Sequence, residues 1–184
     1  MAKEVTRVML VDKQHKGLLQ LIGALELSTN QLTYFYSSSK NSVEMIKLIH
    51  ALSKQYHDQQ KLYLSWDCAG WHTSRKLADE VTKLNQPEYR QRHHSPAIEI
   101  VPLPTSAQFL NVIESVFSGM AKAIIHNSDY QSLAECQHAV DCYFAERNKH
   151  FLENPQRAGK KIWGKEVVKP LFNPANNCKR TNDK

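Results

Sequence analysis

The sequence predicts an α/β domain in which a mixed sheet is flanked by helices. Three apolar segments rich in β-branched and aromatic residues come first, at residues 5–11, 18–27 and 31–37, and they predict an antiparallel meander. Helical spacing of apolar residues then alternates with two short strand-like segments, at residues 61–67 and 98–103. This order is typical of α/β proteins, in which late strands pair in parallel through crossovers. A chain of 184 residues is long enough for one such domain, and two independent domains would be cramped.

Helices are predicted where apolar residues recur at intervals of three and four. The predicted helices are residues 41–57 with an Asn41–Glu44 capping pattern, residues 74–85, residues 107–125, and a last helix after Ser128, capped by Ser128 and Gln131. The apolar face of this last helix is predicted to be Leu133, Cys136, Val140 and Phe144. The segment 86–97 combines prolines with a polar run, which predicts a loop or an insertion.

The positive charge of the chain is concentrated at its end. From Arg157 onward eight basic residues stand against two acidic ones, so this segment accounts for the whole formal charge of +6. We therefore expect a globular domain at residues 1–152 and a basic tail at residues 153–184. Such a tail either attracts nucleic-acid phosphates or only aids solubility. The candidate DNA contacts are Arg157, Lys160, Lys161 and Lys165.

The cysteines and the apolar runs indicate the compartment. The four cysteines show none of the close pairing that holds zinc, and nothing at the N-terminus resembles a signal peptide. No apolar run approaches the length needed to cross a bilayer. The sequence therefore predicts a cytoplasmic protein with reduced thiols and no membrane partner.

Two carboxylates stand where a metal site can be built. Asp67 lies at the predicted carboxyl end of a strand, where open α/β sheets place their ligands. Glu114 lies at the border of the apolar stripe of the helix at 107–125, which follows a strand after a proline-bounded turn. If the two late strands are neighbours, both carboxylates converge on Mg²⁺ and support phosphoryl transfer. Taken singly, Asp67 is also explained as a turn former or helix cap, and Glu114 as a solvated side chain.

Two motifs resemble those of a known enzyme family. The string DCAGWH, from Asp67 to His72, resembles the Asp-Asn-x-x-x-His motif of DDE-superfamily transposases, in the bacterial insertion-sequence group related to mariner elements. The string from Leu103 to Glu114 is similar to that group's Leu-Pro-Pro-Tyr-Ser-Pro-x-Leu-Asn-Pro-Ile-Glu motif. The segments LIGALEL and QLTYFY also resemble the second and third strands of its core. The departures from these motifs, such as Cys68, remove no carboxylate.

The resemblance implies a ribonuclease-H-like fold of the kind found in retroviral integrases, truncated at its first strand. It implies that Asp67 and Glu114 are catalytic and bind Mg²⁺ or Mn²⁺. It also implies that His72 and Asn111 support the site, although His72 is equally explained as the start of a helix and Asn111 as a helix cap. The implied function is metal-dependent DNA strand cleavage and strand transfer during DNA transposition. The implied partners are transposon ends and target DNA at the bacterial nucleoid, with a homodimer or a full-length transposase as protein partner.

The resemblance also requires a first acidic residue, for which the sequence offers no convincing candidate. Asp12 is the only Asp upstream of Gly23, and its basic neighbours indicate a turn. We therefore expect a catalytic domain without its N-terminal part and with impaired cleavage, so that whether the chain is an enzyme stays open. The alternative is a catalytically inactive DNA-binding or regulatory remnant of a transposase. A third interpretation, an unrelated α/β protein with an RNA-binding tail, predicts Tyr34 and Tyr36 on an exposed sheet face.

Overall fold

The order of elements confirms an α/β domain. The structure is a computed structural model that describes residues 2–9, 18–66, 72, 74–103, 110–126 and 128–159, with the backbone alone described for residues 2–9 and 18. Its elements are β1 (Ala2–Met9), β2 (Leu18–Leu25), β3 (Leu32–Ser37), α1 (Ser42–Gln55), β4 (Lys61–Leu64), α2 (Arg75–Leu84), α3 (Pro87–His93), β5 (Ala97–Ile100), α4 (Val112–Met120), the π-helical turn η2 (Ala121–Ile125) and α5 (Leu133–Glu153).

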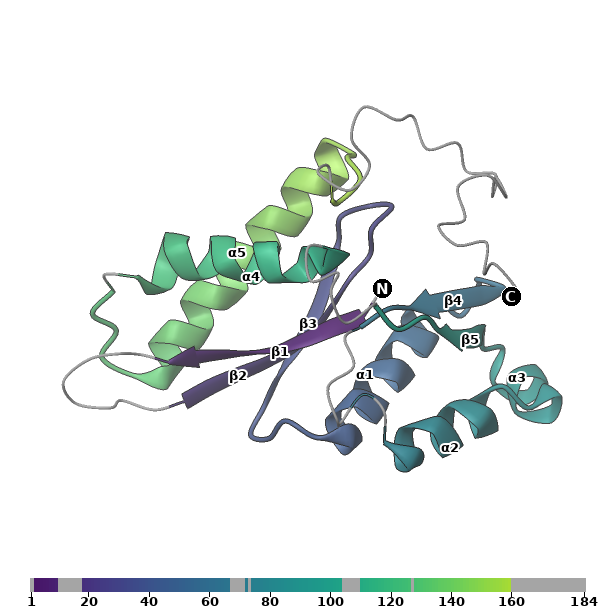
Figure 1. Ribbon diagram of the computed structural model, residues 1–184. Helices are drawn as coiled ribbons and strands as arrows, with labels where there is room; N and C mark the ends of the chain where they lie inside the picture. Colours follow the sequence, from purple (N-terminus) through teal and green to yellow (C-terminus); the bar gives the residue numbers. More distant parts are fainter. Residues whose placement is uncertain are drawn as a thin grey trace, which may run out of the picture.

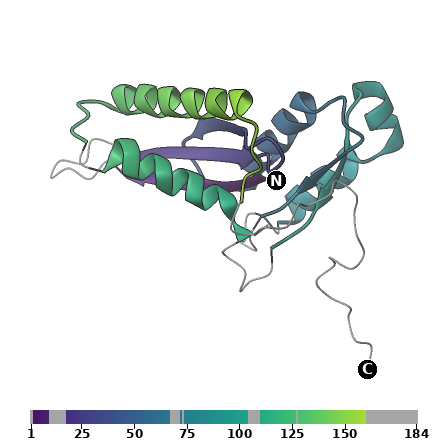
Figure 2. The same ribbon diagram turned by 90° about the horizontal axis from the view of Figure 1, so that it is seen from above.

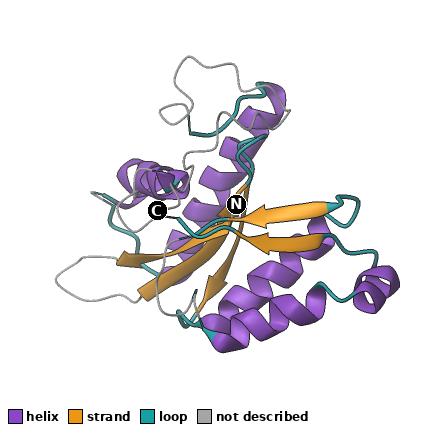
Figure 3. Ribbon diagram, turned by 45° about the vertical axis from the view of Figure 1, so that its right-hand side comes forward, coloured by secondary structure: helices purple, strands orange, loops and turns teal. Residues whose placement is uncertain are grey.

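The described strands form two sheets, which the helices flank (Figure 3). β1, β2 and β3 form an antiparallel sheet in that order, with Leu25 of β2 opposite Leu32 of β3. β4 and β5 form a parallel pair in which Leu62 lies opposite Ile98. Both the antiparallel meander and the parallel pairing of the late strands are therefore confirmed.

Both faces of β2 are buried, because its side chains alternate between two cores. Leu21 and Leu25 pack in one core with Phe117 of α4 and Phe144 of α5. Ile22 points the other way, into a core shared with α1, α2 and the β4–β5 pair. Figure 1 shows α4 and α5 above the three-stranded sheet and α1 and α2 below it. Figure 2 shows α5 running along that sheet, at the opposite end of the molecule from β4 and β5.

The segment between α2 and β5 contains a helix where the sequence predicted a loop, so that prediction is wrong. α3 begins with Pro87, and proline is tolerated in a first helical turn because its missing N–H has no helical acceptor there. The helix ends at His93, its C-cap His94 has a left-handed φ of 46°, and Pro96 lies beyond it. The two prolines that indicated a loop therefore bracket one short helix.

Two helix starts also differ from their predictions. α4 begins at Val112 rather than near residue 107, so Asn111 occupies its N-terminal cap position. α5 is capped by Ser132 and not by Ser128, because the Ser132 side chain accepts a backbone N–H of the first turn. The predicted apolar face of α5 is fully buried at Cys136, Val140 and Phe144.

α4 comes closest to the sheet at Gly23 of β2. A Cβ atom at this position would lie 3.2 Å from Cζ of Phe117 and 3.2 Å from the backbone oxygen of Thr33. Phe117 is only 2% exposed, and the Thr33 backbone is held in the β2–β3 ladder, so neither group gives way easily. The missing side chain of Gly23 thus allows α4 to pack on the strand.

We predict that Gly23→Ala lowers the free energy of unfolding by about 1–3 kcal/mol, because the added methyl group overpacks a tight contact. Urea denaturation of both proteins measures this difference. The control is Gly119→Ala in α4, where the new Cβ would meet only the Tyr143 hydroxyl at 3.6 Å. That variant is expected to be neutral or stabilised by up to about 1 kcal/mol, because alanine favours a helix. Equal stability of Gly23→Ala and the wild type would contradict the tight contact.

Each sheet has one outer edge whose backbone is hydrogen-bonded by an asparagine side chain. On β3, the Asn148 amide of α5 donates to the oxygen of Leu32 (2.8 Å) and accepts from its N–H (2.9 Å). On β5, the Asn85 amide donates to the oxygen of Ile98 (2.8 Å) and accepts from its N–H (2.7 Å). In both places the amide occupies the position of a neighbouring strand, which protects the edge from pairing with another chain.

We predict that Asn148→Ala lowers the free energy of unfolding by about 1–3 kcal/mol, because it leaves two backbone groups of Leu32 without a protein partner. It should also increase self-association through the uncovered edge of β3. Urea denaturation and sedimentation velocity test the two effects. The exposed neighbour Glu146 provides a control, since Glu146→Ala should change stability by no more than about 0.5 kcal/mol. If Asn148→Ala were as stable as the wild type, the two hydrogen bonds of the Asn148 amide would contribute nothing to the free energy of unfolding.

Candidate active site

The parallel pair continues beyond β4 and β5 toward the position of Asp67. The N–H of Val101 donates to the oxygen of Leu64 (2.7 Å), and the N–H of Leu103 donates to the oxygen of Trp66 (2.8 Å). Trp66, the residue before Asp67, is therefore fixed beside the chain that leads from β5 to α4. The condition for the two carboxylates to converge, that the late strands are neighbours, is met.

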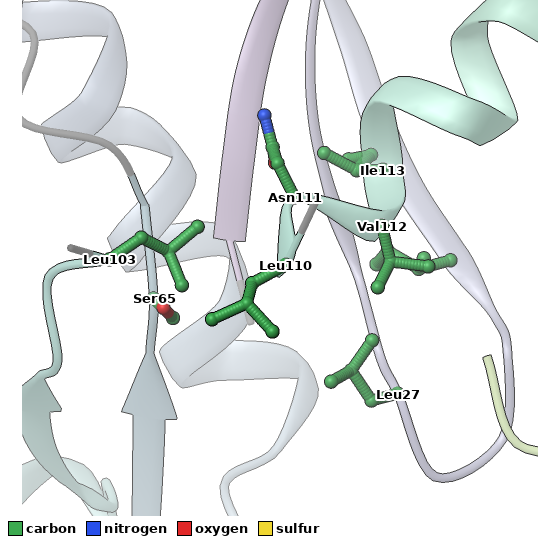
Figure 4. A pocket seen from close by; sticks show the side chains of 8 residues that line it. Leu27, Ser65, Leu103, Leu110, Asn111, Val112 and Ile113 are labelled. Atoms are coloured by element: carbon green, nitrogen blue, oxygen red, sulfur yellow. The ribbon is translucent and has the colours of Figure 1, made fainter. Parts of the chain in front are cut away.

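A small cavity lies where this strand end meets the start of α4 (Figure 4). Its volume is about 20 Å³, which is close to the space of one water molecule and too small for a nucleotide. Ser65 and Leu103 line it from the strand ends, and Leu110 and Asn111 line it from the segment that leads into α4. The end of β4 and the beginning of α4 thus line one cavity.

Sequence analysis did not single out Ser65, which shares this cavity with Asn111. A signal for it was present in the two-residue period of a strand, by which Ser65 and Asp67 belong to the same face. Ser65 is 7% exposed, so the strand end carries a buried hydroxyl at the site.

At the start of α4, the Asn111 side chain is bonded to Glu114. Asn111 is 6% exposed, and its amide donates a hydrogen bond to Oε1 of Glu114. Although Asn111 holds the cap position, its side chain makes no capping bond to the helix backbone. Glu114 is exposed in the first turn of the helix, where the helix dipole favours a negative charge. A buried amide therefore orients a carboxylate that remains open to solvent.

The described residues supply part of the donor set of a metal site. Glu114 fits one ligand position of Mg²⁺ or Mn²⁺, because such hard cations take a few carboxylate oxygens and retain water. Within the described ranges, no group of three or more His, Cys, Asp or Glu side chains lies together. Asp67, the second predicted ligand, and Asp12 both lie outside these ranges.

His72 is packed against the same strand end. It is 5% exposed, and its ring centroid lies 5.5 Å from that of Trp66, with the two planes 30° apart. α2 begins only at Arg75 and is capped by Ser74, so His72 does not start the helix. His72 therefore lies near the residue before Asp67, in a packed position.

The basic residues proposed for DNA contact are described at one position, Arg157. It is exposed and lines a groove formed with the end of β2 and with β4. The next residue, Ala158, is 3% exposed, and its N–H donates to the oxygen of Leu27 (2.8 Å). Leu27 also lines the small cavity at the site, so the chain after α5 is anchored beside it. Lys160, Lys161 and Lys165 lie outside the described residues.

Tyr34 and Tyr36 do not form an exposed aromatic face, so the prediction tied to RNA binding is wrong at these positions. Both hydroxyls donate to Oδ1 of Asp141 in α5 at 2.7 Å, and that of Tyr36 also donates to the oxygen of Gln137 (3.0 Å). Burial, and then the nearby Asp141 carboxylate, raise the pKa of both phenols above the ordinary value. α5 therefore covers this side of the sheet and holds both rings against it.

A comparison with protein families gives one match that covers most of the chain. Residues 1–137 match the family described as DDE superfamily endonuclease, about three quarters of the chain. The chain belongs to this family. The matched range spans β1 to the start of α5 and includes Asp67, Asn111 and Glu114. A search of curated proteins gives no match.

A comparison with solved structures supports the fold of the family. The chain is similar to a chain in the cryo-EM structure of the simian T-cell lymphotropic virus intasome in complex with PP2A regulatory subunit B56 gamma, with a TM-score of 0.56 and 14% sequence identity. The likeness covers 92% of this chain and 55% of that chain, so this chain spans about half the length of its neighbour. At this identity the likeness shows the fold alone. Together with the family membership, it identifies the mixed α/β domain as ribonuclease-H-like.

Proposed function

We propose that the chain is the catalytic domain of a transposase in the bacterial insertion-sequence group related to mariner elements. Its reaction is divalent-metal-dependent cleavage and transfer of DNA strands, on transposon ends and target DNA in the bacterial cytoplasm. The narrower group rests on the motifs at residues 67–72 and 103–114, and membership of the DDE superfamily endonucleases supports the reaction class.

One observation carries the proposal: a residue just before Asp67 and the residue that bonds the Glu114 carboxylate line the same small cavity. Ser65 and Asn111 line the same small cavity, and Asn111 donates to the Glu114 carboxylate. Asp67 follows Ser65 by two residues, so the strand period favours the same face for both side chains. This shared cavity supports the proposal that the carboxylates of Asp67 and Glu114 hold one divalent ion.

In this proposal Asp67 and Glu114 hold the metal ion, Mg²⁺ or Mn²⁺. When bound, the ion supplies activation of a water or 3′-hydroxyl and stabilises the leaving oxygen of an in-line displacement. The Asn111 amide keeps one Glu114 oxygen aligned, which reduces the rearrangement needed when the ligand set forms. His72, packed on Trp66, fixes the strand end that leads into Asp67. The first acidic ligand of the family's site is left unassigned in this chain.

The basic end of the chain is proposed to contact the DNA backbone through Arg157, Lys160, Lys161 and Lys165. Support comes from the anchor of Ala158 on Leu27, which starts this segment next to the candidate site. Such contacts act on phosphates and are independent of sequence. A homodimer, or pairing with a full-length transposase, is the proposed protein partnership. Among the helices in the described ranges, none is long and apolar enough to span a membrane.

A specific observation favours a second function: the sequence offers no convincing first acidic residue. A catalytically inactive DNA-binding or regulatory remnant would keep the fold and the basic tail and would lack strand cleavage. A nicking assay on supercoiled DNA with Mn²⁺, paired with a DNA-binding assay, separates the two functions.

We predict that Asp67→Asn and Glu114→Gln each lower Mn²⁺-dependent nicking by at least about 100-fold, since loss of a mere orienting partner of a metal ligand already costs 10- to 100-fold. The controls are Asp79→Asn and Glu153→Gln, which remove exposed acids on α2 and α5. Nicking by the site variants at the rate of the controls would exclude the assigned roles. A wild type that binds DNA and never nicks it would favour the regulatory remnant.

We predict that Asn111→Ala lowers nicking by about 10- to 100-fold, because the Glu114 carboxylate loses the amide that aligns it. The effect is expected as weaker Mn²⁺ binding, so raising the Mn²⁺ concentration should restore part of the rate. A merely structural role would instead lower the urea midpoint and leave the Mn²⁺ dependence unchanged. Measuring the rate over a range of Mn²⁺ concentrations, together with urea denaturation, distinguishes the two outcomes.

A further inference from the structure

A groove of about 400 Å³ lies between the end of β2 and β4. Its volume falls within the range of small-molecule sites, about 300–1,000 Å³. The four residues of β4, Lys61–Leu64, line one wall, residues 26–28 line the other, and Leu52 of α1 adds apolar surface. Leu27 lines both this groove and the small cavity at the candidate site, so the groove adjoins that site.

A carboxylate held by two hydroxyl groups lines the groove. Oε1 of Glu26 accepts from the Ser28 hydroxyl (2.5 Å), and Oε2 accepts from the Tyr56 hydroxyl (2.9 Å). Burial opposes ionisation of Glu26, but hydrogen bonds from Ser28, Thr29 and Tyr56 outweigh it and lower its pKa, so the group is ionised at neutral pH. Each carboxylate oxygen can accept a further hydrogen bond. Glu26 therefore offers two acceptors, fixed side by side, to the N–H donors of a ligand.

The edge of β4 that lies away from β5 adds donors on the side of the groove. The carbonyls of Gln60, Leu64 and Trp66 accept hydrogen bonds from the β5 side. Because neighbouring residues of a strand alternate in the direction of their hydrogen bonds, the N–H and oxygen of Lys61 and Tyr63 point away from β5. In the described part of the chain, no strand pairs with this edge. Its N–H groups are thus available to acceptors of a ligand.

An exposed aromatic ring and two cations also line the groove. Tyr63 is 55% exposed. The Lys61 ammonium lies 5.3 Å from the centroid of the Tyr63 ring and is held 2.9 Å from Oε2 of Glu99. Arg157 supplies the second cation. Exposed aromatic rings are platforms on which unpaired bases stack, and lysine and arginine attract backbone phosphates. The groove therefore combines a stacking surface, phosphate-binding cations and a carboxylate.

An unpaired guanine is complementary to this set of groups. Its Watson–Crick edge carries adjacent N–H donors that suit the two oxygens of Glu26, whereas thymine carries a single N–H there. Its O6 and N7 are acceptors that suit the N–H groups at the edge of β4. We propose that the groove binds an unpaired guanine nucleotide of single-stranded DNA, with the base at Glu26 and Tyr63 and its phosphate toward Arg157. This assignment rests on the proposed function, since it takes DNA as the ligand.

Fluorescence anisotropy on the full-length chain with short labelled oligonucleotides tests the proposal. Metal ions are omitted, so that strand cleavage does not contribute to the signal. Oligo-dT with one central dG should bind about tenfold more tightly than oligo-dT alone, because thymine leaves one Glu26 oxygen without a donor. The sequence-independent contacts of basic residues are the same for both oligonucleotides. Deoxyinosine in place of dG lacks the amino group and should lose most of the preference.

Two variants locate the site, and one serves as the control. Glu26→Gln should remove the preference for dG, because an amide presents only one acceptor oxygen. Tyr63→Ala should weaken binding of the dG oligonucleotide by about tenfold through loss of stacking. Since Tyr63 is exposed, this variant keeps the fold and tests the groove even where Glu26→Gln does not fold. Glu88→Gln removes an exposed acid of α3 and should leave affinity and preference unchanged.

Three results would overturn the proposal. The first is equal affinity of the wild type for the dG oligonucleotide and for oligo-dT, which would assign binding to sequence-independent contacts and leave the proposed function standing. The second is an unchanged preference in folded Glu26→Gln or wild-type affinity of Tyr63→Ala, since either would place the base elsewhere. The third is a wild type that binds no oligonucleotide, which would contradict the proposed function as well.

Discussion

The parallel hydrogen bonding between β4 and β5 is the constraint on which the candidate site depends. Parallel strands end at the same edge of a sheet, so the segments that leave β4 and β5 start side by side. The bond from Leu103 to Trp66 extends this pairing two residues past β4 and three residues past β5. The chain that leaves β5 is thus set against the end of β4 as far as Leu103, and Ser65 and Asn111 line the same cavity. Without the pairing of β4 with β5, nothing in the described structure would relate the motif at residues 67–72, which follows β4, to the motif at residues 103–114, which follows β5.

The position of α4 adds a second constraint, because it is set by packing on the other sheet. Phe117 of α4 lies against Gly23 on one face of β2. The opposite face of β2 packs in the core that it shares with α1, α2 and the β4–β5 pair. The three-stranded sheet therefore fixes the helix that carries Glu114, while the two-stranded sheet fixes the chain that leads to Asp67. β2 contributes side chains to both cores, so the helix that carries Glu114 and the strand that leads to Asp67 are packed against the same strand.

Much of this architecture could be predicted from local pattern, because each element buries one regular face. The spacing of Met45, Leu48 and Leu52 predicted α1, and all three side chains are buried. Prolines misled the prediction for residues 86–97, because the same residue that ends a helix is also favoured in its first turn. The bond from Asn148 to Leu32 joins residues 116 positions apart, and no local pattern contains such a contact.

The sequence predicted some features of the candidate site and not others. Motif spacing selected Glu114, and strand order supported its approach to Asp67. The exact start of α4 was not predictable, because the stripe of apolar residues continues through Leu110 while the helix does not. Asn111 ends that continuation by using its amide on the Glu114 side chain instead of on the helix backbone. The sequence therefore indicated that the late strands are neighbours, whereas the orientation of the Glu114 carboxylate followed only from its bond with Asn111.

The distribution of charge is best understood from where the basic segment is attached. The formal charge of residues 157–184 equals that of the whole chain, so the rest of the molecule provides no net attraction for phosphate. At physiological ionic strength, exposed charges act over only about 8 Å, so a tail anchored far from the site would not raise the local concentration of DNA there. Ala158 is bonded to Leu27, and Leu27 lines the cavity between β4 and α4. Under the proposed function, a neutral domain with a cationic segment tethered at this point would attract DNA to one place on its surface, beside the cavity at the start of α4.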